Sequence, residues 1–135
     1  MATGVLTRIP IHTDARASFV DITPQIKELV ANSAVKSGTC HVFVPHTTAG
    51  LIINEGYDPN VARDILTHLD KLVPYGAAYT HREGNASAHV KTALLGNSAS
   101  LLVEDGTLVL GTWQSVFLCE FDGPREREII VRIDD

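Results

Sequence analysis

Apolar and polar residues alternate along several short stretches of the chain, which is the period of half-buried β-strands. The pattern runs through residues 5–12, where Pro10 favours an edge strand because proline lacks a backbone N–H. Asp-Gly pairs in the turns 104–106 and 122–124 indicate hairpin connections. Further strands are expected around residues 18–20, 39–46, 51–53, 100–103, 107–121 and 127–133.

Two longer segments show the three- and four-residue apolar spacing of amphipathic helices. The first is expected to begin with Thr23 as its cap and Pro24 in its first turn, and to end before Gly38. The second is expected to begin at the cap Asp58 and to stop at Pro74. The predicted buried positions are Ile26, Leu29, Val30 and Val35 in the first helix and Val61, Ile65, Leu69 and Leu72 in the second.

A shorter third helix is predicted to begin at Asn85 or Ser87 and to end at Gly96, a residue suited to the position after a helix. Residues 75–85 have no periodicity and are predicted to form a loop. Strands before, between and after three helices favour an α+β fold with a mainly antiparallel sheet. The predicted inward-facing residues of the third helix are Val90, Ala93 and Leu94.

Length and composition are those of a single globular domain covering residues 1–135. The chain is 44% hydrophobic and 20% charged, which is close to the average for globular proteins. Its net charge of -5 opposes binding to nucleic acid and to anionic lipid. Because the sequence shows neither a secretory signal core nor a run of about 20 apolar residues, we expect a cytoplasmic protein without a membrane partner.

Three histidines beside predicted turns or loops are the main candidates for chemistry. His46 ends a strand-like run, whereas His81 and His89 flank a polar stretch. If folding brings them together, their imidazoles can hold Zn²⁺ or a similar divalent ion with a position open for substrate, and Glu55 could act as a base. A metal-free site is equally consistent with the pattern, with one histidine acting as a general acid or base beside a carboxylate.

Other charged residues have structural as well as functional interpretations. Asp58 fits a helix cap and Asp64 fits a solvated helix face, although either carboxylate could orient a histidine. Arg125 and Arg127 could clamp a phosphate. Pairing of these arginines with neighbouring glutamates at the surface fits the sequence as well.

Two cysteines and one tryptophan occur within the predicted strands. Cys40 and Cys119 are far apart in sequence, which favours two reduced and buried thiols. Trp113 is expected on the core face of its strand. Gln114 lies on the opposite face and, if buried, needs polar partners that a neighbouring subunit could supply.

Several motifs taken together resemble the YjbQ-like family, also called the secondary thiamine-phosphate synthase family. The similarity covers nearly the whole chain and consists of V-P-H-T-T-A-G at 44–50, I-N-E at 53–55, D-P at 58–59, N-A-S-A-H at 85–89 and G-T-W-Q at 111–114. The resemblance implies an α+β fold with a mainly antiparallel, barrel-like sheet capped by helices. It also implies a homotrimer with pockets near subunit contacts. The implied activity is a weak thiamine-phosphate synthase, which joins hydroxymethylpyrimidine diphosphate to thiazole phosphate and releases pyrophosphate.

The resemblance and the residue chemistry together define the candidate site. The candidate catalytic residues are His46, Glu55, Asp64, His81 and His89, and the same three histidines are candidate metal ligands. The candidate substrate-binding residues are Asn54, Asp58, Arg82, Gln114 and Arg125. A diphosphate leaving group favours Mg²⁺, whereas three imidazoles suit a softer ion such as Zn²⁺. The alternative functions are a metal-dependent hydrolase or lyase acting on a small metabolite, and a noncatalytic ligand-binding trimer.

Overall fold

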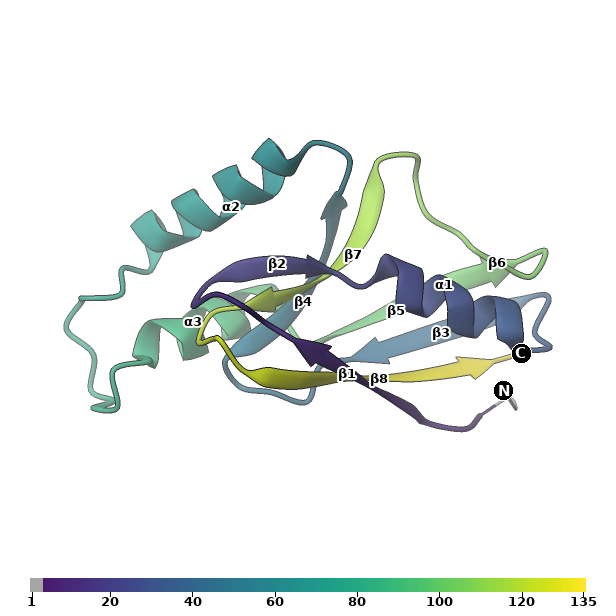
Figure 1. Cartoon of the computed structure of the whole chain (residues 1–135), viewed down its shortest axis with the longest axis horizontal. Helices are drawn as coiled ribbons and strands as arrows, with labels where there is room; N and C mark the ends of the chain where they lie inside the picture. The colour runs from purple at the N-terminus through teal and green to yellow at the C-terminus, as the bar shows by residue number, and fades with distance from the viewer. Residues whose placement is uncertain (1–3) are drawn as a thin grey trace.

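The structure is a computed structural model that describes residues 4–135, and Figure 1 shows how its helices and strands are arranged. The helices are α1 (Thr23–Asn32), α2 (Pro59–Leu72) and α3 (Ala86–Leu95). The strands are β1 (Thr7–His12), β2 (Ser18–Asp21), β3 (Gly38–Phe43), β4 (Ala49–Glu55), β5 (Ser98–Glu104), β6 (Thr107–Leu108), β7 (Gln114–Glu120) and β8 (Glu126–Asp134). None of the helices within residues 4–135 has the length and hydrophobicity of a membrane-spanning segment.

The strands form two antiparallel sheets that curl around a common core as part of a barrel. Within the described residues, the larger sheet has the order β1-β8-β3-β5-β6 and the smaller sheet the order β2-β7-β4. The strand pairs are antiparallel, and β1 lies at an edge, as Pro10 predicts. The predicted α+β fold with a mainly antiparallel, barrel-like sheet is therefore confirmed.

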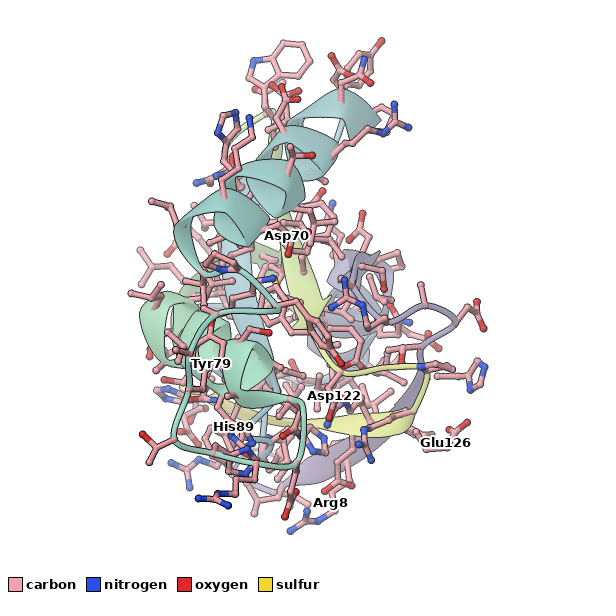
Figure 2. The ribbon with its side chains drawn as sticks, turned by 90° about the vertical axis from the view of Figure 1, so that its left-hand side faces the viewer. Arg8, Asp70, Tyr79, His89, Asp122 and Glu126 are labelled. Carbon is pink, nitrogen blue, oxygen red and sulfur yellow. The ribbon has the colours of Figure 1, made fainter. Side chains whose placement is uncertain are left out.

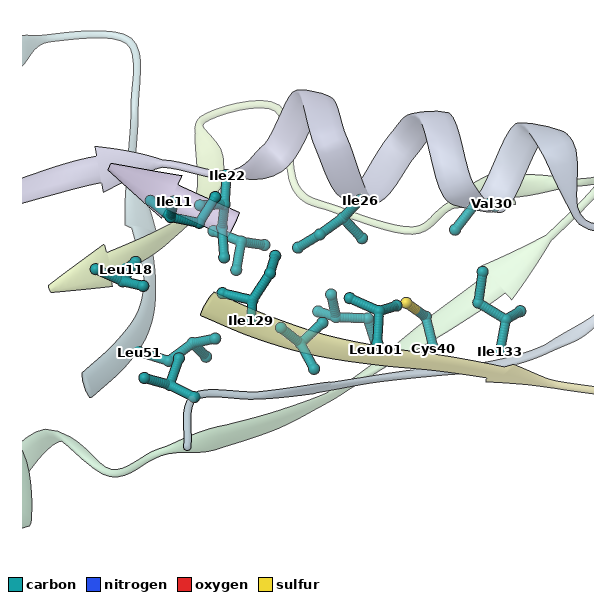
Figure 3. Close-up of a cluster of buried hydrophobic side chains, with 14 of the residues drawn as sticks. Ile11, Ile22, Ile26, Val30, Cys40, Leu51, Leu101, Leu118, Ile129 and Ile133 are labelled. Carbon is teal, nitrogen blue, oxygen red and sulfur yellow. The ribbon is translucent and has the colours of Figure 1, made fainter. Parts of the chain in front are cut away.

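The main hydrophobic core lies between α1 and the two sheets. Figure 3 shows Ile26 and Val30 pointing from α1 toward the larger sheet, where Cys40 and Ile133 lie beneath them. Leu118, from the smaller sheet, belongs to the same cluster. Since burial of an aliphatic side chain of this size contributes about 1.5–3 kcal/mol, this cluster is the principal reason that the two sheets stay together.

A second, smaller cluster attaches α2 and α3 to the other face of the smaller sheet. It consists of Leu69, Ala88, Phe117, Cys119 and Phe121. Both cysteines are free and buried, as predicted. Burial raises the pKa of Cys40 to about 11 and also raises the pKa of Cys119, so neither thiol supplies a thiolate at neutral pH.

Helix α1 is shorter than its apolar spacing predicts, and its cap is a different residue. The helix ends at Asn32, and Val35 reaches the core from the segment that follows it. Ile22 occupies the N-cap position instead of Thr23. The Thr23 hydroxyl accepts a hydrogen bond from the Val116 N–H at 2.8 Å, so it serves a β7 backbone group and not its own helix.

The predicted strand 107–121 is in fact two strands in different sheets. β6 belongs to the larger sheet and β7 to the smaller sheet, so the chain must turn between them. Gln114 closes this turn, because its side-chain oxygen accepts from the Gly111 N–H at 2.8 Å. Trp113 lies within the turn and is 57% exposed, so the prediction that it belongs to the core was wrong.

The predicted buried faces of α2 and α3 are also partly wrong. Leu72 at the end of α2 is 75% exposed, and Val90 and Leu94 on α3 are 40% and 62% exposed. The face of α3 that is buried consists of small and polar residues, namely Ala86, Ser87, Ala88, Lys91 and Thr92. Apolar residues occur on more than one side of this short helix, so spacing alone did not identify the face that packs against β4.

Candidate functional site

A buried ion pair lies where β7 ends and β8 begins. Arg127 donates from Nε to Glu120 Oε1 at 2.8 Å and from Nη2 to Glu120 Oε2. Glu120 is completely buried and Arg127 is 7% exposed. Burial by itself would raise the pKa of Glu120, but Arg127, the Asp122 N–H and the Thr13 hydroxyl together hold that pKa below its ordinary value.

Two threonines complete the network around this ion pair. Thr13 donates its hydroxyl proton to Glu120 Oε1 at 2.7 Å, and Thr48 accepts from Arg127 Nη2 at 2.8 Å. The Asp122 N–H donates to Glu120 Oε2 at 3.0 Å. Both charges are thus paired and further hydrogen-bonded, which is the condition under which a buried ion pair is tolerated. The sequence prediction that Arg127 pairs with a glutamate is confirmed, but the pair is buried and not at the surface.

His46 lies beside this network, in the segment between β3 and β4. The predicted strand 39–46 stops at Phe43, and His46 Nε2 accepts a hydrogen bond from the Glu128 N–H at 3.0 Å. Asn97 donates to the His46 carbonyl oxygen at 2.9 Å. Burial lowers the pKa of His46, and the positive charge of Arg127 lowers it further. The ring is therefore neutral around neutral pH.

His81, in the loop before α3, and His89, on α3, have neighbouring rings. Their ring centroids are 5.2 Å apart with an angle of 61° between the ring planes. Both line a pocket of about 340 Å³, and His89 is on α3 (Figure 2). We call this space the histidine pocket; its remaining lining residues are Tyr79, Thr80, Ala86 and Val90. It is largely apolar apart from the two imidazoles and the hydroxyl groups.

The turn after β7 connects the histidine pocket to the buried ion pair. Asn85, which occupies the N-cap position of α3, donates to Asp122 Oδ2 at 2.9 Å. Arg125 donates to the same carboxylate oxygen at 2.9 Å and to the Asp122 carbonyl oxygen at 2.7 Å. Figure 2 shows Asp122 and His89 at the same end of the molecule. We refer to this region, with His46, His81 and His89, as the histidine end.

Four other candidate residues lie at the opposite ends of β4 and β7. Glu55 is the last residue of β4 and is paired in register with Gln114, the first residue of β7. Asp58 caps α2 as predicted, accepting from the Asn60 N–H at 2.9 Å. A seven-residue strand spans about 20 Å at ~3.3 Å per residue. One molecule therefore does not bring this group, which we call the acidic end (Asn54, Glu55, Asp58 and Gln114), close to His46.

The acidic end borders a pocket of about 370 Å³ beneath α2. Carboxylates of Asp21, Glu55 and Asp58 line it together with Arg63. Its floor includes aromatic and aliphatic side chains, namely Phe19, Leu66 and Phe117. The exposed rings of Tyr57 and Trp113 pack edge to face at 5.3 Å and line a neighbouring pocket together with Glu55 and Asp58. Polar and apolar groups are therefore presented side by side at this end as well.

The remaining predicted charged residues are distributed along α2, α3 and the loop between them. Asp64 is exposed on α2, and Arg82 is exposed in the loop that precedes α3. Lys91 on α3 is buried and pairs with Asp70 on α2. This contact ties α2 to α3 and leaves Lys91 unavailable to an anion in this conformation.

The three histidines do not form a single metal-binding cluster in this structure. Within residues 4–135, no three His, Cys, Asp or Glu side chains are grouped so that they could hold a metal ion. The Nε2 lone pair of His46 is already occupied by the Glu128 N–H. A three-histidine ion therefore does not fit the present arrangement, and binding of a divalent metal stays a prediction.

Sequence reasoning missed several residues that shape the site. Thr13 follows β1 and carries no recognisable motif, although it donates to buried Glu120. Thr48 belongs to the V-P-H-T-T-A-G motif, so its importance had a signal but its partner, Arg127, did not. Tyr57 became notable only once folding placed it against Trp113.

Comparison with known proteins establishes the class to which this fold and these motifs belong. The family model described as "UPF0047 protein YjbQ-like" matches residues 7–134. The chain belongs to this YjbQ-like family. It is 47% identical to a UPF0047 protein of Methanocaldococcus jannaschii, over 96% of this chain and 94% of that protein. It is 39% identical to the UPF0047 protein YugU of Bacillus subtilis, over 96% and 98% of the two chains.

Solved structures of related proteins share the fold. An uncharacterised YjbQ/UPF0047 family protein from Clostridium acetobutylicum is 47% identical and superposes with a TM-score of 0.92, covering 94% of this chain and 98% of that one. A YbjQ-like protein of unknown function from Sulfolobus solfataricus is 36% identical with a TM-score of 0.92, covering 97% of each chain.

Proposed function

We propose that the histidine end binds a small phosphorylated heterocycle and carries out a thiamine-phosphate synthase-like transfer. The reaction joins hydroxymethylpyrimidine diphosphate to thiazole phosphate: the thiazole nitrogen forms a bond to the pyrimidine methylene carbon as the bond from that carbon to the diphosphate oxygen breaks. The observation that carries the proposal is the largely apolar histidine pocket, whose lining contains the paired His81 and His89 rings. Such a pocket combines a surface for a flat ring with groups that can donate to phosphate oxygens.

Charged residues near the pocket support an anionic ligand. Arg82 lies next to His81 in the loop before α3 and is exposed. Arg125 is held by Asp122 through two hydrogen bonds, which fixes its guanidinium close to the start of α3. Donors fixed in advance can stabilise charge that develops on a departing pyrophosphate. The proposed roles are therefore substrate positioning by Arg82 and Arg125 and proton donation by His81 and His89.

The experiment uses the purified full-length chain with both substrates and Mg²⁺, and thiamine phosphate is measured by chromatography. Because general acid–base groups typically contribute a factor of 10² or more, His81→Ala and His89→Ala should each reduce the rate at least about 100-fold. His68→Ala, an exposed histidine on α2, is the matched control and should leave the rate unchanged. Equal rates in the wild type and in both pocket variants would refute the assignment of the reaction to this site.

We also propose that the chain acts as a homotrimer in which the histidine end of one subunit meets the acidic end of the next. Exposed apolar residues, including Trp113 and Tyr57, provide contact surface of the kind that marks protein interfaces. A head-to-tail contact closes into a ring, as a trimer requires. Subunits carrying His81→Ala and subunits carrying Glu55→Gln should each be inactive alone and should recover activity when co-expressed. A lack of recovery would leave the transfer reaction possible but would refute the shared site.

A further inference from the structure

We infer that His46 is held as the neutral tautomer with its proton on Nδ1, and that it serves as a fixed hydrogen-bond donor to a phosphate oxygen and not as a metal ligand or a general base. The inference concerns one ring at the histidine end and goes beyond the proposed function. The choice of phosphate as the acceptor rests on the proposed function, whereas the tautomer rests on the hydrogen bond at Nε2.

A backbone hydrogen bond at Nε2 fixes the tautomer of His46. β3 is paired with β8 only as far as Phe43, which lies opposite Ile130. The N–H of Glu128, two residues before Ile130 on β8, therefore has no β3 partner, and His46 Nε2 accepts it at 3.0 Å. A backbone N–H can only donate, so Nε2 must carry a lone pair. In a neutral imidazole the proton is then on Nδ1.

The chain holds both His46 and Glu128 in place. The His46 carbonyl oxygen accepts from Asn97 at 2.9 Å. Glu128 follows Arg127, which is fixed by its buried pair with Glu120. A change of tautomer would place Nε2–H against the Glu128 N–H, two donors facing each other at hydrogen-bond distance. The other tautomer is therefore strongly disfavoured.

The other ring nitrogen of His46 is Nδ1. His46 is half-buried, and within residues 4–135 the hydrogen bond of its ring is the one at Nε2. Nδ1 is not one of the fully buried atoms without a hydrogen bond, so it keeps some contact with solvent. The Nδ1–H group is thus available to a guest at the surface of the site. A neutral donor suits an acceptor oxygen, and it keeps this role at any pH at which the ring stays uncharged.

This tautomer leaves His46 without a lone pair for a metal ion. A metal needs an imidazole lone pair, but Nε2 has committed its lone pair to Glu128 and Nδ1 carries the proton. Within the described residues, the rings of His81 and His89 accept no hydrogen bond from a backbone N–H, so an ion could still bind those two rings. His46 would not join them.

The test is long-range ¹H–¹⁵N NMR of the full-length ¹⁵N-labelled protein, recorded at about pH 7 to 8, where an unperturbed histidine is mostly neutral. The His46 signals are assigned by their absence in His46→Gln. Separate samples then receive Zn²⁺ or pyrophosphate. His41, on the outer face of the larger sheet, is the internal control because it is bound to Ser100 and not to the histidine end.

We expect Nε2 to show the shift of an unprotonated nitrogen and Nδ1 that of a protonated one. Zn²⁺ should leave both unchanged even where the His81 and His89 signals move, and pyrophosphate should shift Nδ1. A protonated Nε2, a mixture of tautomers or a Zn²⁺ response shared by the three histidines would overturn the inference. An Nδ1 signal that saturating pyrophosphate leaves unchanged would overturn the donor role. None of these readouts depends on thiamine phosphate formation, so each proposal can fail separately.

Discussion

The two ends of β7 differ in how the protein uses its polar residues. At the histidine end, Glu120 is completely buried, and every charge in its network has a partner within the chain. At the acidic end, Trp113 is 57% exposed and Tyr57 is 79% exposed, and the nearby carboxylates of Glu55 and Asp58 accept from backbone N–H groups. The first region is a buried network with its hydrogen bonds satisfied, whereas the second is an exposed apolar surface of the kind found at protein interfaces.

This difference separates residues that maintain the fold from residues available to a ligand. Arg127 was a candidate phosphate clamp, but its donors are occupied by Glu120 and Thr48. Arg82, a less distinctive residue in the sequence, is exposed in a loop beside the histidine pocket. Substitutions in the two regions should therefore affect different measurements: folding for the buried pair of Glu120 and Arg127, and assembly for the exposed rings of Trp113 and Tyr57.

The largest effect is expected from Arg127→Ala. The substitution leaves the Glu120 carboxylate buried without its cation, which typically costs about 3–5 kcal/mol. Urea unfolding at neutral pH should show this loss as a lower midpoint with a similar slope. Arg125→Ala is the matched control, because Arg125 is exposed and its partner Asp122 is only partly buried; it should change the free energy of unfolding by at most about 1 kcal/mol. Similar losses in both variants would mean that the buried pair contributes no more to the free energy of unfolding than the pair of Arg125 and Asp122.

The same pair predicts a direction for the pH dependence. Because the folded-state pKa of Glu120 is depressed, its stabilising contribution is present above the unfolded pKa of about 4.3 and is lost as pH falls through the folded pKa. In Arg127→Ala, burial remains without the arginine and should raise the pKa of Glu120. The stability of the variant relative to the wild type should consequently improve in acid, as measured by urea midpoints across the acidic range.

An intermediate effect is expected at His46. His46→Leu leaves the Glu128 N–H without an acceptor in a half-buried position and should cost about 1–3 kcal/mol of folding free energy. His46→Gln keeps an acceptor oxygen at a similar reach and should recover a large part of that loss. The wild type's advantage over the leucine variant is present above the ordinary histidine pKa of 6.5 and is lost as pH falls, because the folded-state pKa is lowered. Equal unfolding midpoints for the two variants would contradict the backbone contact.

Local signals in the sequence predicted the parts of the fold that depend on local chemistry. Asp58 caps α2 because its carboxylate accepts from a nearby N–H, a contact within two residues. Pro10 marks an edge strand because its missing donor is a property of the residue itself. Both statements could be made without knowing which elements meet in space.

Predictions that required long-range contacts were less successful. The continuous apolar pattern of 107–121 hides a change of sheet, which is decided by the partners of β6 and β7 and not by their own residues. Lys91 is buried because Asp70 lies opposite it on another helix. His46 was recognisable as a candidate, but its function as an acceptor depends on Glu128, 82 positions away in the sequence. The sequence pattern singled out His46 and Arg127 but could not assign Glu128 and Thr48 as their partners.

A smaller effect on folding is expected at the acidic end. Trp113→Ala removes an exposed ring and its edge contact with Tyr57, which should change the free energy of unfolding by about 1 kcal/mol. If the proposed trimer is correct, the same substitution should reduce the oligomer size seen by sizing chromatography, even though the subunit stays folded. Val109→Ala, another exposed apolar position, is the control and should keep the wild-type size. A full-size oligomer in Trp113→Ala would argue against an interface at this end.

The smallest effect is expected at His12, which repeats the charge pairing of the buried network in an exposed setting. His12 lies 2.5 Å from Glu126 and 2.9 Å from Asp14. The hydrogen bond and charge of Glu126 raise the pKa of His12, with a smaller contribution from Asp14. The added stability is therefore present below the unfolded pKa and is lost as pH rises through the folded pKa. Comparison of wild type with His12→Gln should show a small advantage in mild acid that disappears at higher pH and is reduced by salt. A difference that is independent of both pH and salt would show that His12 acts through packing and not through charge.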